Sequence, residues 1–296
     1  AFVTALRAHR RQASAVTDDK PSTAVAGTDE ADLYAVLKVD VLEIEFGSEL
    51  KSILGTDNDG MLMKRLKAFR RQHAIDSGLV LPQVRVREEP RRGANSYSVR
   101  FFGANVAEGT VRADGFLAIN PGSVKRTIPG EATRDPTFNL PALWVEADAS
   151  QTAREAGYTV VDPLTVLLTH FTEVVRNQGH NLMTRQEAER LVRSVREAQP
   201  TLIEELIPNL LSLSDVQKVL QGLLRERVGI RNIDLILECL VEFSRQTKDP
   251  ETLTERVREK LGLVICQQCT SRDGFVHALT LDPAIERTLR DAVRGG

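Results

Sequence analysis

The sequence predicts an α+β protein built from several subdomains, and three observations support this fold class. Short stretches of alternating apolar and polar residues, typical of strands with one buried face, run from Val41 to about Val145. Longer stretches with helical spacing and short turns follow His180. From Leu263 the chain returns to a strand-like pattern before a final helix. In order, we expect a small α/β sandwich, an inserted β-rich subdomain, an all-α helical subdomain and a truncated α/β subdomain.

Composition limits the classes of protein to consider. A chain of 296 residues has room for about two domains of ordinary size. Hydrophobic residues make up 42% and charged residues 27%, as in a water-soluble globular protein. The net charge of -2 gives no general attraction to nucleic acid or to anionic lipid. Three cysteines are too few for a disulfide scaffold.

The N-terminal segment has its charges after its apolar residues. It reads AFVTALRAHRRQ, the order expected where a membrane helix emerges into the cytoplasm, and the opposite of a secretory signal. An amphipathic tail is the alternative. The next residues, Ala13 to Asp32, are rich in Ala, Ser, Thr and Asp, which indicates a flexible linker.

The first folded part combines strands with one amphipathic helix. Its expected strands are Val41–Phe46, Gln83–Glu88 and Tyr97–Phe101, and the first should bury Leu42, Ile44 and Phe46 while Glu43 and Glu45 face water. A helix is expected over Met61–Ile75, with an apolar stripe formed by Leu62, Leu66, Phe69 and His73. Strand, helix, strand, strand indicates a small α/β sandwich.

The opposite face of that helix is basic. It carries Lys64, Arg65, Lys67, Arg70 and Arg71. Without interleaved aromatic residues for base stacking, this pattern is more typical of a solvated helix face than of a nucleic-acid site. We therefore expect no nucleic-acid partner. The turn Gly55–Gly60 resembles a calcium loop but has a glycine where the first carboxylate ligand belongs, so we expect no metal there.

A junction follows between Thr133 and His170, and two Asp-Pro pairs divide it. Asp135-Pro136 has no helical pattern after it and predicts a turn. Asp162-Pro163 predicts the start of a helix, because aspartate caps free N–H groups and proline suits the first helical position. The β-rich stretch before Pro163 therefore looks like an insertion between the first core and its closing helix, which we expect to end near Arg176.

Helices dominate from Met183 onward. Capping boxes are expected at Thr184 with Glu187 and at Ser214 with Gln217, and another helix should start at Asp249-Pro250. A helix-turn-helix nucleic-acid binder remains an alternative, although its second helix offers only Arg231, Asn232 and Asp234 as polar side chains that could reach bases.

The C-terminal part contains the pair Cys266 and Cys269. A zinc site requires a matching second pair, and a redox motif requires a helix start after the first cysteine, whereas Val264–Gln268 predicts a strand. Two partly buried thiols are the expectation. No arrangement of residues typical of catalysis is evident, so we expect no enzyme, cofactor or metal, with an uncharacterised small enzyme as the alternative of a different class.

Several long motifs resemble the flagellar and type III secretion export-gate family, FHIPEP, in its cytoplasmic domain. They are LAINPG at Leu117–Gly122, PGEATRDPTFNLPALWV at Pro129–Val145, GYTVVDP at Gly157–Pro163, RQEAERL at Arg185–Leu191, VQKVLQGLLRERVGIRN at Val216–Asn232 and TKDPETLTERVR at Thr247–Arg258. The DPTFNLPALWV and TKDP motifs are more similar to flagellar members than to the injectisome (virulence type III secretion) members, which are the alternative.

The resemblance implies a membrane part before a linker, and a cytoplasmic part of four subdomains that assembles into a nonameric ring. Its subdivision of this sequence is a membrane-proximal stub and linker at 1–38, a first α/β subdomain at 39–113 with 163–182, an inserted second at 114–162, a helical third at 183–262 and a partial fourth at 263–296. The chain is accordingly expected to be the cytoplasmic domain of a bacterial inner-membrane protein.

The resemblance also implies a docking role without covalent chemistry. In flagellar members a shallow dimple between the first two subdomains binds export chaperones that carry substrates, and the matching positions here are Asp135, Phe138 and Thr169. The implied partners are chaperone–substrate complexes, the export ATPase complex, other export-gate components and further copies of the chain. An apolar anchor beside two polar groups is a usual composition for a partner groove.

Overall fold

The structure is a computed structural model that describes residue 37, residues 39–54 and residues 60–294. The expected membrane-proximal stub and linker therefore lie outside the described residues, apart from Leu37, and so does most of the calcium-like turn. The described residues from Asp40 onward belong to one unit, Asp40–Gly296.

A four-stranded mixed sheet, here called sheet A, forms the first part of the fold. Its strands are β1 (Leu42–Phe46), β2 (Val84–Glu88), β3 (Ser96–Phe101) and β4 (Ala104–Thr110). The spatial order is β2-β1-β3-β4, with β1 parallel to β2 and antiparallel to β3. Since β1 has a neighbour on each side, its backbone groups are paired along both edges.

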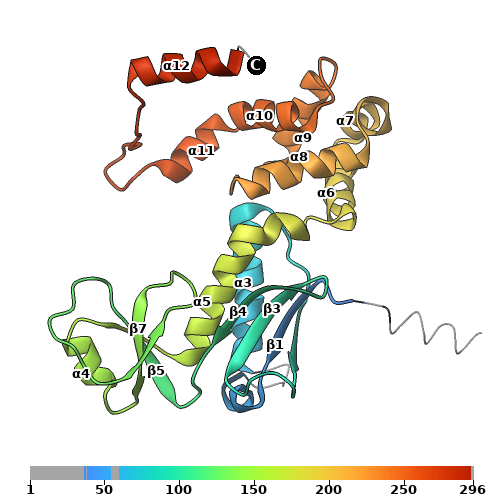
Figure 1. Cartoon of the computed structure of the whole chain (residues 1–296). Coiled ribbons are helices and arrows are strands. Elements are labelled where there is room, and N and C mark those ends of the chain that lie inside the picture. Colours follow the sequence, from blue (N-terminus) through green and yellow to red (C-terminus); the bar gives the residue numbers. More distant parts are fainter. Residues whose placement is uncertain (1–36, 38, 55–59, 295–296) are drawn as a thin grey trace, which may run out of the picture. The chain divides into compact units, whose positions relative to one another are not determined.

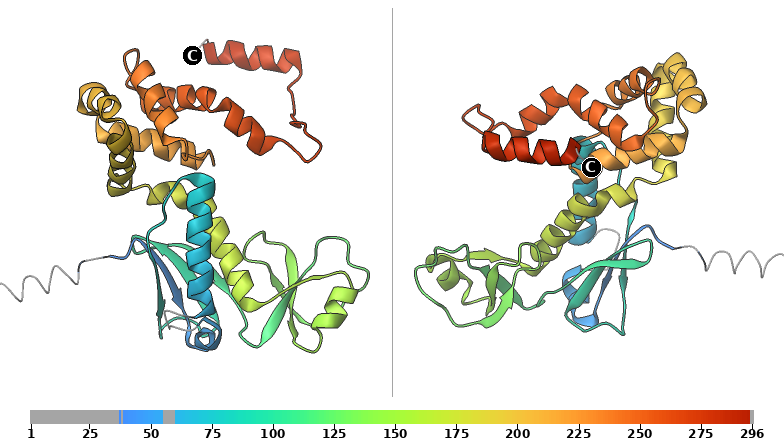
Figure 2. Two further views of the ribbon diagram at one scale, coloured as in Figure 1. Left: turned by 180° about the vertical axis from the view of Figure 1, so that it is seen from behind. Right: turned by 45° about the horizontal axis from the view of Figure 1, so that its top comes forward.

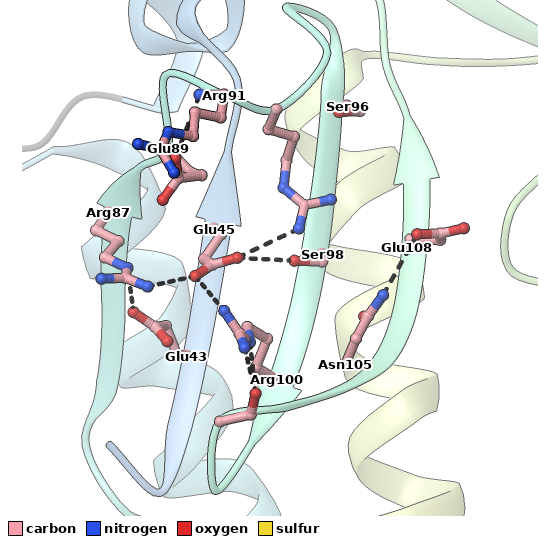
Figure 3. Close-up of polar contacts among 12 residues, drawn as sticks. Glu43, Glu45, Arg87, Glu89, Arg91, Ser96, Ser98, Arg100, Asn105 and Glu108 are labelled. Atoms are coloured by element: carbon pink, nitrogen blue, oxygen red, sulfur yellow. Dashed lines mark hydrogen bonds and ion pairs between the residues drawn. The ribbon is translucent and has the colours of Figure 1, made fainter. Parts of the chain in front are cut away.

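Strand β1 departs from the expectation of one buried face, because all five of its residues are buried. Glu43 and Glu45 are only 6% and 2% exposed. Arg87 on β2 and Arg100 on β3 reach over Glu45 from both sides (Figure 3), and Arg92 completes the set. The distance from Arg100 Nη1 to Glu45 Oε1 is 2.6 Å. Arginine side chains therefore cover the face that the alternation assigned to water.

The charges of these arginines decide the ionisation of the two glutamates. Burial raises the pKa of Glu45, but hydrogen bonds from Arg87 and Arg100 outweigh burial and lower the pKa from 4.5 to about 2. For Glu43, burial prevails over the attraction of Arg87 and raises the pKa. Glu45 is thus held as a carboxylate at the centre of the sheet.

Two long helices cover the other face of sheet A. They are α3 (Met61–Ser77) and α5 (Pro163–Gln178), and they run side by side (Figures 1 and 2). Phe69 of α3 meets Phe171 of α5 edge to face, with ring centroids 5.8 Å apart, and Arg65 donates to the Thr165 hydroxyl at 2.9 Å. The predicted apolar stripe of α3 does face this core. Short helical turns, η1 (Ser48–Leu50) and α2 (Lys51–Leu54), follow β1.

A second four-stranded sheet, here called sheet B, occupies the segment between β4 and α5. Its order is β6-β7-β5-β8, all antiparallel, with bounds β5 (Gly115–Ile119), β6 (Glu131–Arg134), β7 (Pro141–Glu146) and β8 (Thr159–Val161). The helix α4 (Ser150–Glu155) lies between β7 and β8 in sequence. Trp144 on β7 is 5% exposed and packs in the main core.

The remaining elements are helical. They are η2 (Gly179–Leu182), α6 (Arg185–Ala198), α7 (Pro200–Glu204), η3 (Glu205–Leu210), α8 (Leu213–Arg225), α9 (Ile233–Phe243), α10 (Pro250–Lys260), α11 (Gly262–Cys269) and α12 (Pro283–Arg294). Two sheets followed by a largely helical region confirm the α+β fold class. The subdomain boundaries themselves stay a prediction.

Most predicted helix starts are confirmed by their caps. The side chains of Asp162, Thr184 and Asp249 each accept a backbone N–H of the helix that they begin. Of the expected capping box at Thr184 only half is present, because the Thr184 N–H donates to the Leu182 carbonyl and not to Glu187. The capping prediction at Ser214 is wrong: α8 begins after Ser212, whose hydroxyl accepts from the Asp215 N–H while Asp215 accepts from the Ser212 N–H. Ser214, the predicted cap, lies inside the first turn.

The predicted strand at Val264–Gln268 is also wrong, because these residues belong to the helix α11. Continuation of the helical path from α10 outweighs the β-branched residues of this stretch. Cys266 and Cys269 are both exposed rather than partly buried, whereas Cys239 on α9 is buried.

The described part of the chain contains no helix long and apolar enough to cross a membrane. Within the same ranges, no three His, Cys, Asp or Glu side chains are grouped so that they could hold a metal ion.

Substituting Glu45→Gln tests the ion-pair cluster on sheet A. We expect the free energy of unfolding at pH 7 to fall by about 2 to 3 kcal/mol, because three arginines lose a buried partner. Since the folded-state pKa of Glu45 is lowered, its contribution is complete above about pH 4.5 and is lost as the pH falls towards 2.

Urea denaturation at pH 7, 4 and 2.5 measures this difference, and Glu108→Gln on the exposed side of β4 is the matched control. The difference in the free energy of unfolding between the wild-type chain and Glu45→Gln should become smaller below pH 4.5. A gap that stays constant over this range would contradict the assignment.

Candidate partner-docking site

The turn between β6 and β7 is held together from within by Asp135. Its carboxylate accepts the Phe138 N–H at 2.6 Å, its own N–H donates to the Leu140 carbonyl at 2.9 Å, and its carbonyl accepts the Asn139 N–H at 2.9 Å. Asp135 is only 4% exposed. The predicted Asp-Pro turn is therefore present, and the aspartate is its internal brace.

The same turn exposes apolar side chains at its tip. Phe138 is 63% exposed and Leu140 is 40% exposed. Between them Asn139 adopts a positive φ of 57°, a conformation that asparagine tolerates better than most residues. Arg134 adds a further bond to the Asn139 carbonyl at 2.9 Å. An aromatic ring is thus presented to water on a backbone with several fixed contacts.

Helix α5 supplies the other side of the predicted site. Asp162 fixes the helix start by accepting the Thr165 N–H at 3.0 Å, and Pro163 occupies the first turn. One turn after Thr165, the Thr169 hydroxyl donates to the Thr165 carbonyl at 2.7 Å. Thr169 is exposed and the next residue, His170, is buried. The solvent-facing side of α5 therefore borders its buried side at these two residues.

A buried hydrogen bond joins α5 to sheet A beneath this region. Tyr97 Oη lies 2.7 Å from His170 Nδ1. Burial raises the pKa of Tyr97 and lowers the pKa of His170, so both groups stay neutral at neutral pH. Gly109 leaves room for the tyrosine, because a Cβ at that position would lie 2.6 Å from Tyr97 Oη.

Asp135 acts electrostatically on this buried pair. Its negative charge raises the pKa of Tyr97 further and, for His170, partly offsets the lowering caused by burial. The turn that presents Phe138 is therefore close to the helix that carries Thr169.

The predicted site residues thus differ in their placement. Phe138 and Thr169 are exposed on two different elements, whereas Asp135 is buried and supports the turn. Sequence reasoning did not link Tyr97 to His170, because they are 73 residues apart and each by itself looks like an ordinary core residue. No motif signals such a pair.

Comparison with known proteins gives the family. The family model described as "FHIPEP family" matches residues 1–296. The chain belongs to the FHIPEP family.

The curated proteins similar to this chain include several named for flagellar biosynthesis. The Flagellar biosynthesis protein FlhA of Bacillus subtilis is 37% identical over 259 residues, which cover 88% of this chain and 38% of that protein. FlhA of Escherichia coli is also 37% identical, over 257 residues that cover 87% of this chain and 37% of that protein. The chain therefore spans less than two fifths of the length of these relatives.

Solved structures share the fold. The Chlamydia pneumoniae CdsV protein superposes with a TM-score of 0.72 at 24% identity, covering 86% of this chain and 74% of that one. The nonameric EPEC SctV-C gives a TM-score of 0.58 at 17% identity, covering 87% of this chain and 83% of that one. CdsV in complex with CdsO also gives 0.72, at 23% identity, covering 86% and 78%.

Replacing Asp135 by asparagine tests the coupling between the turn and α5. The substitution keeps the side-chain shape and removes the charge, so the pKa of His170 should shift further down, because burial then acts without opposition. NMR titration of the His170 ring signals in the wild-type chain and in the variant measures the shift. A His170 titration that stays in place or moves to higher pH would show that the two groups are not coupled.

Proposed function

We propose that this FHIPEP chain is the cytoplasmic docking platform of a flagellar type III protein export gate, and that it binds chaperone–substrate complexes at the turn carrying Phe138. The proposal places it on the cytoplasmic side of a bacterial inner membrane, joined to a membrane part that precedes it. It assigns the chain binding and no covalent chemistry. The 37% identity to proteins named for flagellar biosynthesis supports the flagellar assignment.

The observation that carries the docking site is the combination of an exposed ring and a braced backbone. Phe138 leaves 63% of its surface in water although the turn beneath it is tied by Asp135. Keeping a large aromatic ring exposed gives no benefit to the fold itself, whereas aromatic rings on fixed supports are the usual anchors of protein interfaces. Little ordering entropy then remains to be lost on binding.

The three residues take different parts in this proposal. Phe138 is the apolar anchor, and Thr169 offers a polar contact on the side of α5. Asp135 acts through the turn, because its carboxylate already accepts the Phe138 N–H and is buried. A partner therefore needs an apolar side chain for the ring of Phe138, with polar groups around it.

The proposal also includes assembly and further partners. Solved relatives include a nonameric form, SctV-C, and a complex of CdsV with CdsO. We infer that this chain forms a nonameric ring with copies of itself, and that the export ATPase complex and other gate components meet it there. The equivalent injectisome protein is the alternative function, because the solved relatives of the same fold include a type III secretion system protein, EscV.

Substituting Phe138→Ala tests the docking site. Loss of an aromatic anchor costs about 2 kcal/mol or more, which is roughly a 30-fold rise in Kd for a purified flagellar chaperone–substrate complex. Isothermal titration calorimetry measures the affinity.

The matched control is Phe102→Ala, since Phe102 is also a surface phenylalanine, 48% exposed, on the hairpin between β3 and β4. The Phe102→Ala variant should bind the chaperone–substrate complex with the same affinity as the wild-type chain. Equal weakening by both variants, or none by Phe138→Ala in a folded protein, would reject the site. Binding only to an injectisome chaperone complex would select the alternative function.

A further inference from the structure

A cavity of about 380 Å³ lies away from the docking turn, among elements that are distant in sequence. Its walls come from the C-terminal half of α3 and Leu79 after it, the end of α5 with η2, the end of α8 with the segment that follows, and Gln268 of α11. Backbone contacts fix this corner: the Ile230 N–H donates to the Ser77 carbonyl at 2.7 Å, and a Cβ on Gly78 would lie 2.4 Å from the Arg231 nitrogen. The volume lies within the range of small-molecule pockets.

The cavity has an apolar floor. Phe69, Leu79, Val175, Leu224 and Val228 contribute to its lining, and Leu79 and Val175 are fully buried members of the main core. Such a surface favours the hydrocarbon or aromatic part of a ligand, at about 25 cal/mol for each Å² removed from water.

Two histidines in the wall have unmet hydrogen-bonding capacity. His73 Nε2 and His180 Nδ1 are buried, and within the described residues neither has a hydrogen-bond partner. A buried polar atom without a partner costs about 1 to 3 kcal/mol. Neither nitrogen has surface open to water in this structure, so a polar group or a water bonds to it only when the ring turns toward the cavity. The wall therefore favours a ligand with a polar end.

The charges around the cavity favour a negative ligand. Arg176 is the most available cation, because its side chain is 57% exposed and its ion-pair partner, Glu173, lies 4.0 Å away. Arg227 also lines the cavity but already binds Glu173 at 3.0 Å and Asn177. The one acid in the lining, Asp76, accepts from Gln72 at 2.7 Å.

The same neighbouring charges and burial determine the pKa values of the two histidines. Burial lowers the pKa of His73, the charge of Arg176 lowers it further, and Asp76 opposes both. Burial likewise lowers the pKa of His180, the charge of Arg225 lowers it further, and a hydrogen bond with the Asn177 backbone opposes both. Both rings are therefore neutral at neutral pH, in surroundings where positive charge is in excess.

We propose that this cavity is a binding site for a small carboxylic acid with an apolar body, with the carboxylate at Arg176 and the two histidines and the hydrocarbon on the Phe69 side. An acid of about six to ten carbons fits the space. A bound carboxylate places a negative charge against the guanidinium of Arg176 and accepts hydrogen bonds from it.

Binding is coupled to proton uptake. A carboxylate beside the rings raises the pKa of His73 and His180 relative to the empty cavity, so the complex holds more protons than the free protein. Affinity should rise as the pH falls from 8 towards 5.5. The neighbouring charges of Asp76, Arg225 and Arg227 are present in both states and do not reverse this sign.

Sodium hexanoate is the probe, with hexylammonium chloride as the control of equal length and opposite charge. NMR titration of the whole chain should show hexanoate shifting the ring signals of His73 and His180 with a Kd of about 1 mM, tightening severalfold between pH 8 and pH 5.5. Hexylammonium should bind at least about tenfold more weakly.

The substitution Arg176→Gln should raise the Kd for hexanoate about fivefold or more. Because Arg176 is largely exposed, this variant keeps its fold even if a histidine variant does not. Arg193→Gln, on an arginine 65% exposed on α6, is the matched control and should leave the affinity unchanged. Equal binding of the two probes, shifts elsewhere than at His73 and His180, or equal effects of both variants would overturn the proposal.

Discussion

The apolar face of α5 is the constraint on which the described part of the fold depends. Its buried side chains, including Leu167 and Phe171, share one core with both sheets and with the helices that follow. Each such side chain contributes about 2 kcal/mol when buried. Because α5 starts directly after β8 of sheet B and packs on α3 beside sheet A, neither sheet can move without disturbing this helix. Asp135 in the turn carrying Phe138 acts on His170 of α5 through its charge.

Local chemistry allowed much of this to be predicted from sequence. The start of α5 at Asp162-Pro163 and the turn at Asp135-Pro136 follow from the side chains of two or three neighbouring residues, and both are present. The apolar stripe of α3 follows from periodicity alone.

Features that depend on contacts between residues far apart in the chain could not be predicted from the sequence. Glu45 reads as solvent-facing because its three arginines come from 42 to 55 residues away and were not recognisable as its neighbours. Similarly, the resemblance assigns Asp135 to a partner-binding surface, whereas the structure buries it in the turn, where its carboxylate accepts the Phe138 N–H. The cap of α8 does not belong to this group, because Asp215 stands three residues after Ser212 in the sequence and so marks Ser212 as the better choice than Ser214. The helix α11 shows that continuation of a helical path can outweigh β-branched residues.

The central claim is that Phe138 lies in the interface with chaperone–substrate complexes, and site-specific photocrosslinking tests it most directly. A photoreactive benzoylphenylalanine would replace Phe138 in one protein and Phe102 in another, and each would be irradiated with the same chaperone–substrate complex. We expect a covalent product with the chaperone or its substrate from position 138 and little from position 102. A product from position 102 alone, or none from position 138 at concentrations where the complex forms, would contradict the account.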